Sequence, residues 1–240
     1  MIKPYTAVGL IPTVRGIRKR SDIMINLEHL SHLVKAAAWL SSLDLPVRLI
    51  AFPEGALQGF NDEVLDLDHV QFAREGAIDI PGEETAYLGN IARQYDCFII
   101  AQAKARHPDL KDRFFNVGFI LDPKGEVILQ HYKVSPLFPV EHSVCPHDVY
   151  DWWIEKYGRN LQAFWPVVDT EIGRLGIHAS EIDLGNVAVR GFVAAVGKRR
   201  APYAEVFEPE MPENERGLHL SPSCRAYAAA SASCERWRGI

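Results

Sequence analysis

Apolar runs of strand length alternate with amphipathic segments of helix length along the first part of the chain. The runs at 6–14, 46–52 and 97–103 are rich in apolar residues, and PVRLIAF at 46–52 lacks the alternation of a half-exposed strand. Between the runs, 22–43 and 83–95 carry apolar residues at helical spacing, as expected of helices that lie on a sheet. This order predicts an α/β protein with helices packed over a mixed sheet.

The middle of the chain extends the predicted sheet with different connections. Strands are expected at 114–121 and 127–132, because the turn sequence DPKGE joins them as a hairpin. The segment 136–163 is long, irregular and rich in aromatic residues, so we expect a surface excursion near a pocket. Residues 166–180 predict two further strands, and 183–196 has a helical pattern.

Charge and cysteine content narrow the range of partners. The formal net charge is −5 and there is no long uninterrupted apolar run, so neither a nucleic-acid partner nor a membrane partner is expected. The spacing of the cysteines matches no zinc site and no dense disulfide framework; they are Cys97, Cys145, Cys224 and Cys234. We therefore expect a cytoplasmic protein with reduced thiols and no metal.

Polar residues stand where three predicted strands leave the sheet. Glu54 follows the strand at 46–52, Lys133 ends the second strand of the hairpin with Glu141 eight residues later, and Ser180 and Glu181 follow an apolar strand. In open α/β sheets this edge is where ligands usually bind. Taken alone, a glutamate after a strand is usually a cap or a surface residue, and a lysine at a strand end is usually solvated. A serine at a strand-to-helix junction is usually an N-cap.

Taken together, the segments AFPEGALQGF, YKVSPLFPVE and GRLGIHASE are far more specific. In this order they resemble the three motifs around the catalytic residues of the nitrilase superfamily of carbon–nitrogen hydrolases, and most nearly its aliphatic amidase and formamidase branch. The resemblance covers roughly residues 5–210, and Asn116 also fits the family's hairpin before the lysine. It implies a four-layer α-β-β-α sandwich and a homodimer or higher homo-oligomer.

The resemblance also implies roles for the residues at the strand ends. Glu54 would be the general base and acid, and Lys133 would stabilise the oxyanion together with the backbone N–H of Glu181. Ser180 stands at the nucleophile position, and Glu141 would orient the substrate or tether the lysine. The implied reaction is cofactor-free hydrolysis of a non-peptide C–N bond in a small amide, nitrile or carbamoyl compound, with release of ammonia.

Serine at the nucleophile position is a departure from the family, whose motif G-x-x-G-x-x-x-C-x-[DE] has cysteine there. A thiol has a pKa of about 8.5 and an alcohol is several units harder to deprotonate, so we expect low or absent activity from Ser180. Activation by His178 is the less favoured alternative to an ordinary strand histidine. The serine is either a deliberate exchange that traps substrate or a natural change that leaves a weak or inactive enzyme. The alternative function is a catalytically inactive protein that binds a ligand or a partner.

Two further features bear on the predicted site and domain. Cys145 is the alternative thiol near the predicted site, and HSVCPH at 142–147 resembles an incomplete metal-binding motif. An inert loop cysteine is favoured over both a nucleophile and a metal ligand. Residues 1–216 are expected to form the hydrolase domain. The stretch 217–240 has neither strand alternation nor a helical stripe, so we expect an irregular or disordered tail, and a fold that is incomplete at the C-terminus through truncation or a frame shift.

Overall fold

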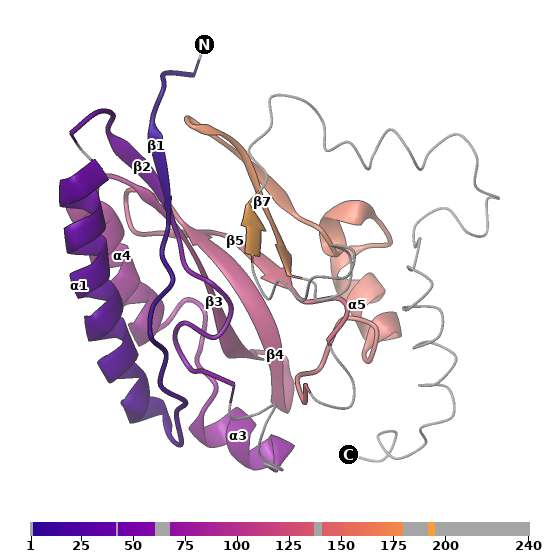
Figure 1. Cartoon of the computed structure of the whole chain (residues 1–240). Helices are drawn as coiled ribbons and strands as arrows, with labels where there is room; N and C mark the ends of the chain where they lie inside the picture. The colour runs from indigo at the N-terminus through magenta and orange to yellow at the C-terminus, as the bar shows by residue number, and fades with distance from the viewer. Residues whose placement is uncertain (1, 42, 61–67, 137–140, 180–191, 195–240) are drawn as a thin grey trace, which may run out of the picture. The chain divides into compact units, whose positions relative to one another are not determined.

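The computed structural model describes residues 2–41, 43–60, 68–136, 141–179 and 192–194 (Figure 1). Its strands are β1 Thr6–Gly9, β2 Val47–Ala51, β3 Phe98–His107, β4 Leu110–Leu121, β5 Val127–Tyr132, β6 Val167–Thr170, β7 Gly173–Ala179 and β8 Phe192–Ala194. Its helices are α1 Ile23–Ser41, α3 His69–Glu75, α4 Glu83–Tyr95 and α5 Tyr150–Tyr157, with 3-10 turns η1 Arg20–Asp22 and η2 Leu161–Ala163. None of the described helices is long and apolar enough to cross a membrane.

The larger sheet has the strand order β1-β2-β3-β4-β5. Its first half is parallel, because helices connect β1 to β2 and β2 to β3, whereas β3, β4 and β5 are antiparallel and joined by hairpins. The shorter sheet has the order β6-β7-β8 and is antiparallel. Strand β3 is thus the boundary between the parallel and antiparallel halves of the larger sheet.

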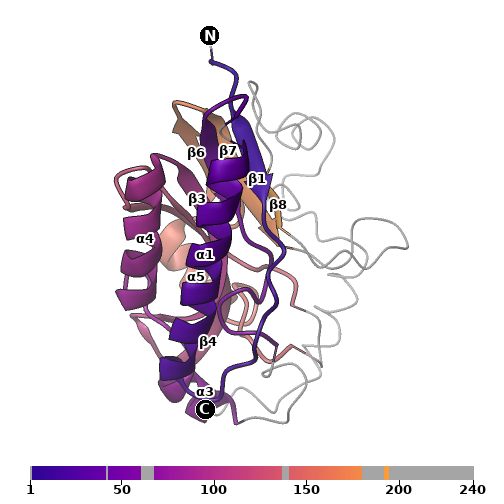
Figure 2. The same cartoon turned by 60° about the vertical axis from the view of Figure 1, so that its left-hand side comes forward.

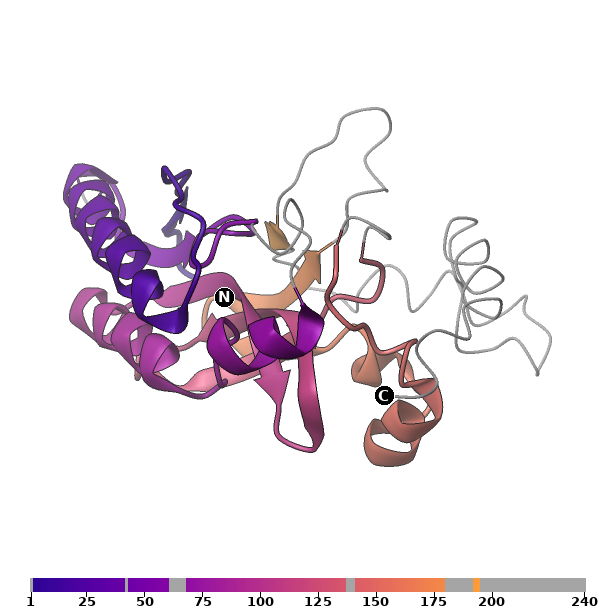
Figure 3. The same ribbon diagram turned by 90° about the horizontal axis from the view of Figure 1, so that it is seen from below.

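Helices α1 and α4 lie side by side against one face of the larger sheet, as Figures 1 and 2 show from two directions. They bury apolar side chains that include Leu27, Leu30 and Leu88 in the main core. The opposite face packs on the shorter sheet through a second core. Ile100 of β3 and Leu175 of β7 both belong to this second core. Seen from below, α3 lies between the α1–α4 pair and α5 (Figure 3).

The predicted α/β fold class is confirmed, with α-β-β layers in the described residues. The fourth layer and the incomplete C-terminus stay predictions, as does the boundary at 216, because 195–240 lie outside the described part of the chain. The same holds for the tail at 217–240.

The helix predicted at 83–95 coincides with α4, and its ends show why. At the start, the backbone N–H of Gly82 donates to Oγ1 of Thr85 at 2.8 Å, and two acidic residues stand in the first turn, where the helix dipole favours negative charge. At the end, Asp96 adopts the left-handed conformation with φ of 50°, which stops the helix before β3.

Some predicted boundaries are wrong. The strand predicted at 6–14 ends at Gly9, the excursion at 136–163 contains the helix α5, and 192–194 form strand β8 although 183–196 had a helical pattern. Helix α3 has no counterpart in the sequence prediction, because its seven residues are too few for a clear apolar period. Trp153 in this segment and Phe164 just after it are 2% and 1% exposed and belong to the main core.

We predict that Leu88→Ala, which empties a fully buried position between α4 and the sheet, lowers the free energy of unfolding by about 2–5 kcal/mol. The matched control is Leu43→Ala, because Leu43 is 74% exposed and its truncation leaves no cavity. Urea unfolding followed by circular dichroism measures both. Equal losses in the two variants would contradict the placement of α4.

Candidate active site

Three polar residues form a row across β3, β4 and β5. Lys104 on β3 pairs with Asn116 on β4, and the backbone N–H of Lys133, directly after β5, donates to the carbonyl oxygen of Asn116 at 2.8 Å. Side chains alternate between the faces of a strand, so this row shares its face with Ile100 and Ile120, which belong to the core between the sheets. The row places a side-chain amide between two lysines.

Glu54 reaches the row from the parallel half of the sheet. It follows β2 in a tight turn, where Gly55 has φ of 77°, a left-handed conformation that glycine adopts without strain. The backbone N–H of Gly55 donates to Oε1 of Gln102 at 2.9 Å, and Nε2 of Gln102 donates to Oδ1 of Asn116 at 2.7 Å. Gln102 therefore fixes both the turn that carries Glu54 and the direction of the Asn116 amide.

Two carboxylates and an ammonium converge on that amide. Nδ2 of Asn116 donates to Oε1 of Glu54 and to Oε1 of Glu141, the second at 2.8 Å. Nζ of Lys133 lies 3.3 Å from Oε1 of Glu54 and 2.7 Å from Oε2 of Glu141. We call Glu54, Lys104, Asn116, Lys133 and Glu141 the acid–lysine cluster, and all five are buried.

Glu141 is the most heavily bonded member of the cluster. Its Oε1 accepts from Nζ of Lys104 at 3.2 Å, from Asn116, and from Oγ of Ser143 at 2.6 Å, while Oε2 accepts from Lys133. Burial acts to raise the pKa of Glu141, but the ammoniums of Lys104 and Lys133 outweigh it and hold the pKa well below its ordinary value. A carboxylate offers about four acceptor sites, so Glu141 is suited to holding other groups and not to taking a proton.

Lys133 is held in the charged state by its neighbours. Burial acts to lower the pKa of Lys133, and Lys104 acts in the same direction. The carboxylates of Glu141 and Glu54 outweigh both effects and keep the pKa above its ordinary value. Lys133 therefore supplies a fixed positive charge that is buried away from water, where a charge acts strongly on nearby groups.

Glu54 differs from Glu141 in that its contacts leave one oxygen open. Oε1 accepts from Asn116 and Lys133, whereas Oε2 accepts no hydrogen bond from the residues that the structure describes. An oriented carboxylate with one open oxygen is the arrangement that a general base requires. The two glutamates thus have different chemical capacities.

The structure brings together three of the five residues predicted for the site, Glu54, Lys133 and Glu141. Ser180 and Glu181 lie outside the described residues, and the described part of β7 ends at Ala179. Their roles stay predictions.

Sequence analysis did not single out Gln102, Lys104 or Ser143. The period of two that places Gln102 and Lys104 on one face of β3 is visible in the sequence. Their alignment with Asn116 depends on the strand register, which that period does not supply. The sequence therefore shows that Gln102 and Lys104 share a face of β3, but it does not show which residues of β4 lie beside them.

The alternative thiol and the metal motif receive no support. Cys145 is 0% exposed, and burial raises the pKa of its thiol, with the nearby Asp148 carboxylate acting in the same direction. A buried thiol of this kind is a poor nucleophile. Within the described ranges no group of three or more His, Cys, Asp or Glu residues is arranged to hold a metal ion.

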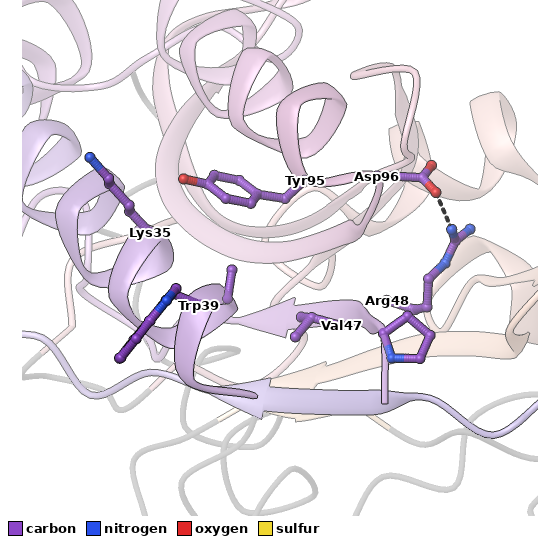
Figure 4. A pocket seen from close by; sticks show the side chains of 8 residues that line it. Lys35, Trp39, Val47, Arg48, Tyr95 and Asp96 are labelled. Atoms are coloured by element: carbon purple, nitrogen blue, oxygen red, sulfur yellow. Dashed lines mark hydrogen bonds and ion pairs between the residues drawn. The ribbon is translucent and has the colours of Figure 1, made fainter. Parts of the chain in front are cut away.

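A shallow pocket of about 500 Å³ lies elsewhere, between the C-terminal ends of α1 and α4 and the start of β2 (Figure 4). Trp39 and Tyr95 contribute its aromatic side chains, and Arg48 at its rim forms an ion pair with Asp96. Because Glu54 follows the far end of β2 and no member of the acid–lysine cluster lines this pocket, it is separate from the candidate active site.

The fold and cluster together define an α/β protein with a buried site of two carboxylates and two ammoniums. Comparison with known proteins gives the family: the sequence model described as carbon-nitrogen hydrolase matches residues 7–181. The chain therefore belongs to the carbon–nitrogen hydrolase family, and the resemblance to the nitrilase superfamily is confirmed.

Several relatives are formamidases. The chain is 30% identical to the formamidase of Bacillus thuringiensis (strain Al Hakam) over 145 residues, which is 59% of this chain and 40% of that protein. It is 30% identical to the formamidase of Helicobacter acinonychis (strain Sheeba) over 95 residues, 40% of this chain and 27% of that protein. The chain thus spans two fifths or less of the length of these relatives.

Two solved structures are also similar in fold to this chain. One is Nit3 of Saccharomyces cerevisiae, a member of branch 10 of the nitrilase superfamily, with a TM-score of 0.49 and 17% identity over 71% of this chain and 54% of Nit3. Another is an amidase from Nesterenkonia sp., with a TM-score of 0.44 and 13% identity over 73% of this chain and 56% of that protein.

We predict that Glu141→Gln lowers the free energy of unfolding by about 3–5 kcal/mol near pH 7, because two buried ammoniums lose their shared carboxylate. The pKa of Glu141 is lower in the folded state than in the unfolded state, so its contribution is complete above the ordinary value of about 4.3 and is lost as the pH falls below it. The difference from the wild type should therefore narrow on acidification below about pH 4.3.

Urea unfolding at about pH 7 and about pH 4 measures this effect. Glu126→Gln is the matched control, because it removes the same charge from an exposed position in the β4–β5 turn. A loss for Glu141→Gln that stays constant with pH would show that the charge of Glu141 is not what stabilises the cluster.

Proposed function

We propose that this protein is a cofactor-free hydrolase of non-peptide carbon–nitrogen bonds, most suited to a small aliphatic amide, and that it releases ammonia. The observation that carries the proposal is the arrangement of Glu54, whose Oε1 lies 3.3 Å from the ammonium of Lys133 while its Oε2 accepts no hydrogen bond from the described residues. The second carboxylate, Glu141, is held by Lys133 on one oxygen and by several donors on the other. Membership of the carbon–nitrogen hydrolase family and the formamidase relatives support the reaction class.

In the first half of the proposed reaction, the side chain at position 180 attacks the carbonyl carbon of the amide. Glu54 takes the proton of the nucleophile as the new bond forms, and the negative charge moves to the carbonyl oxygen. Lys133 and the backbone N–H of Glu181 stabilise that oxyanion. When the C–N bond breaks, Glu54 returns the proton to the leaving nitrogen, and ammonia departs from an acylated enzyme.

In the second half, water attacks the acyl carbon. Glu54 accepts a proton from the water, the tetrahedral intermediate collapses, and the proton passes to the departing side chain of residue 180. The carboxylic acid leaves and the starting state is restored. Glu141 stays ionised throughout, because its hydrogen bonds to Lys104, Asn116, Lys133 and Ser143 hold it as an anchor for the ammonium of Lys133.

Serine at position 180 limits the rate of this reaction. The general base is a carboxylate, which suits a thiol but is a weak base for an alcohol, whose pKa is several units higher. We therefore propose that the chain as written has low or absent activity. This residue favours the second candidate function, a catalytically inactive relative that uses the same site to bind an amide or acid.

We predict that the protein with Ser180 releases little ammonia and that Ser180→Cys increases release strongly, because a carboxylate base activates a thiol far more readily than an alcohol. Ammonia is measured with formamide, acetamide, simple nitriles and carbamoyl compounds as substrates. In the Ser180→Cys background, Glu54→Gln should reduce kcat by about 10²–10⁴-fold, the usual contribution of a general acid–base group.

Glu75→Gln in the same background is the matched control, because Glu75 is exposed at the end of α3. Silence of Ser180→Cys on all four substrate classes would reject the hydrolase and leave the binding protein. Binding of acetamide or acetate to the wild-type protein, measured by calorimetry, would then support that second candidate.

A further inference from the structure

Lys104 is a buried charge that takes no part in the proton transfers described above. It is 1% exposed on β3, and a fully buried lysine is costly unless it is paired. The backbone is held at this position, since Lys104 N donates to Oε1 of Gln58 at 2.6 Å and its carbonyl accepts from Nε2 of Gln58 at 3.1 Å. Nζ of Lys104 lies 3.2 Å from Oε1 of Glu141, so the structure places a second ammonium against that carboxylate.

The charges of the cluster balance only when Lys104 is counted. Glu54 and Glu141 contribute two negative charges, and Lys104 and Lys133 contribute two positive charges. Without Lys104, one ammonium would face two carboxylates in a region from which water is excluded. A buried surplus charge of this kind is relieved by uptake of a proton, here on one of the carboxylates.

We propose that Lys104 is a positioning residue that keeps Glu141 ionised at neutral pH and holds it against Lys133. Its catalytic consequence rests on the proposed function, because a proton on Glu141 would weaken the anchor that holds the ammonium of Lys133. The charge balance itself does not depend on the reaction and is testable in an inactive protein.

The groups that act on these carboxylates come from several elements. Lys104 lies on β3, Lys133 follows β5, Glu54 follows β2, and Ser143 stands two residues after Glu141. Lys104, Lys133 and the Ser143 hydroxyl act on the carboxylate of Glu141, while Glu141, Glu54 and Lys104 act on the ammonium of Lys133.

The test compares Lys104→Met and Lys104→Gln, which remove the charge, with Lys104→Arg, which keeps it. Carboxyl ¹³C resonances of labelled glutamate report the protonation of each side chain, and Glu54→Gln and Glu141→Gln assign the two resonances. Removal of an opposite charge within hydrogen-bonding distance should raise the titration midpoint of one carboxylate by about one pH unit or more. Lys104→Arg should leave both midpoints close to the wild type.

Lys111→Met is the matched control, because Lys111 is exposed on β4 and its removal changes the net charge equally. Unchanged midpoints in both neutral variants would overturn the proposal. If neither neutral variant folds near pH 7, recovery of circular dichroism near pH 5, where a carboxylate takes up a proton, supports it. Failure to fold at both pH values overturns it.

A second readout separates this proposal from the proposed function. If Ser180→Cys is active, adding Lys104→Met should move the acidic limb of the kcat/KM profile upward by about one pH unit, with rescue by Lys104→Arg. If Ser180→Cys is silent but the midpoints shift, the charge balance holds and the hydrolase fails. If Lys104→Met in the Ser180→Cys background is active with an unchanged pH profile, and the titration midpoints do not shift, the proposed role of Lys104 is rejected and the hydrolase stands.

Discussion

The ion pairs that Glu141 makes with Lys104 and Lys133 are the interaction on which the site depends. Separate burial of any of these charges would be strongly unfavourable, because the interior replaces little of the hydration that each loses. Placed within hydrogen-bonding distance, they compensate one another and hold Glu141 as a carboxylate. That anchoring distinguishes Glu141 from Glu54, whose Oε2 accepts no hydrogen bond from the described residues.

The arrangement of the sheet explains how the two glutamates acquire different surroundings. Glu54 leaves the parallel half of the sheet at the end of β2, where Gly55 turns the chain. The lysines belong to the antiparallel half, on strands joined by hairpins. Gln102 bridges the halves, because it bonds the turn at Gly55 and the amide of Asn116 from the boundary strand β3.

The sequence predicted the fold class, α4 and the meeting of Glu54, Lys133 and Glu141, because apolar periodicity and three specific motifs carry those features. It did not predict Lys104. A lysine within KAR on a strand reads as a solvated side chain until the register places it opposite Asn116. Strand β8 was misassigned because 183–196 shows helical spacing, while pairing with β7 determines the backbone at 192–194.

The row of Lys104, Asn116 and Lys133 has a further consequence for how the strands align. Because side chains alternate between the two faces, a shift of β4 by one residue would turn Asn116 into the apolar core beneath α1 and α4 and carry Phe115 or Val117 between the lysines. Both glutamates would then lose the amide that donates to them. The row thus disfavours misaligned hairpins, and its polar side chains help to select a single pairing of the central strands.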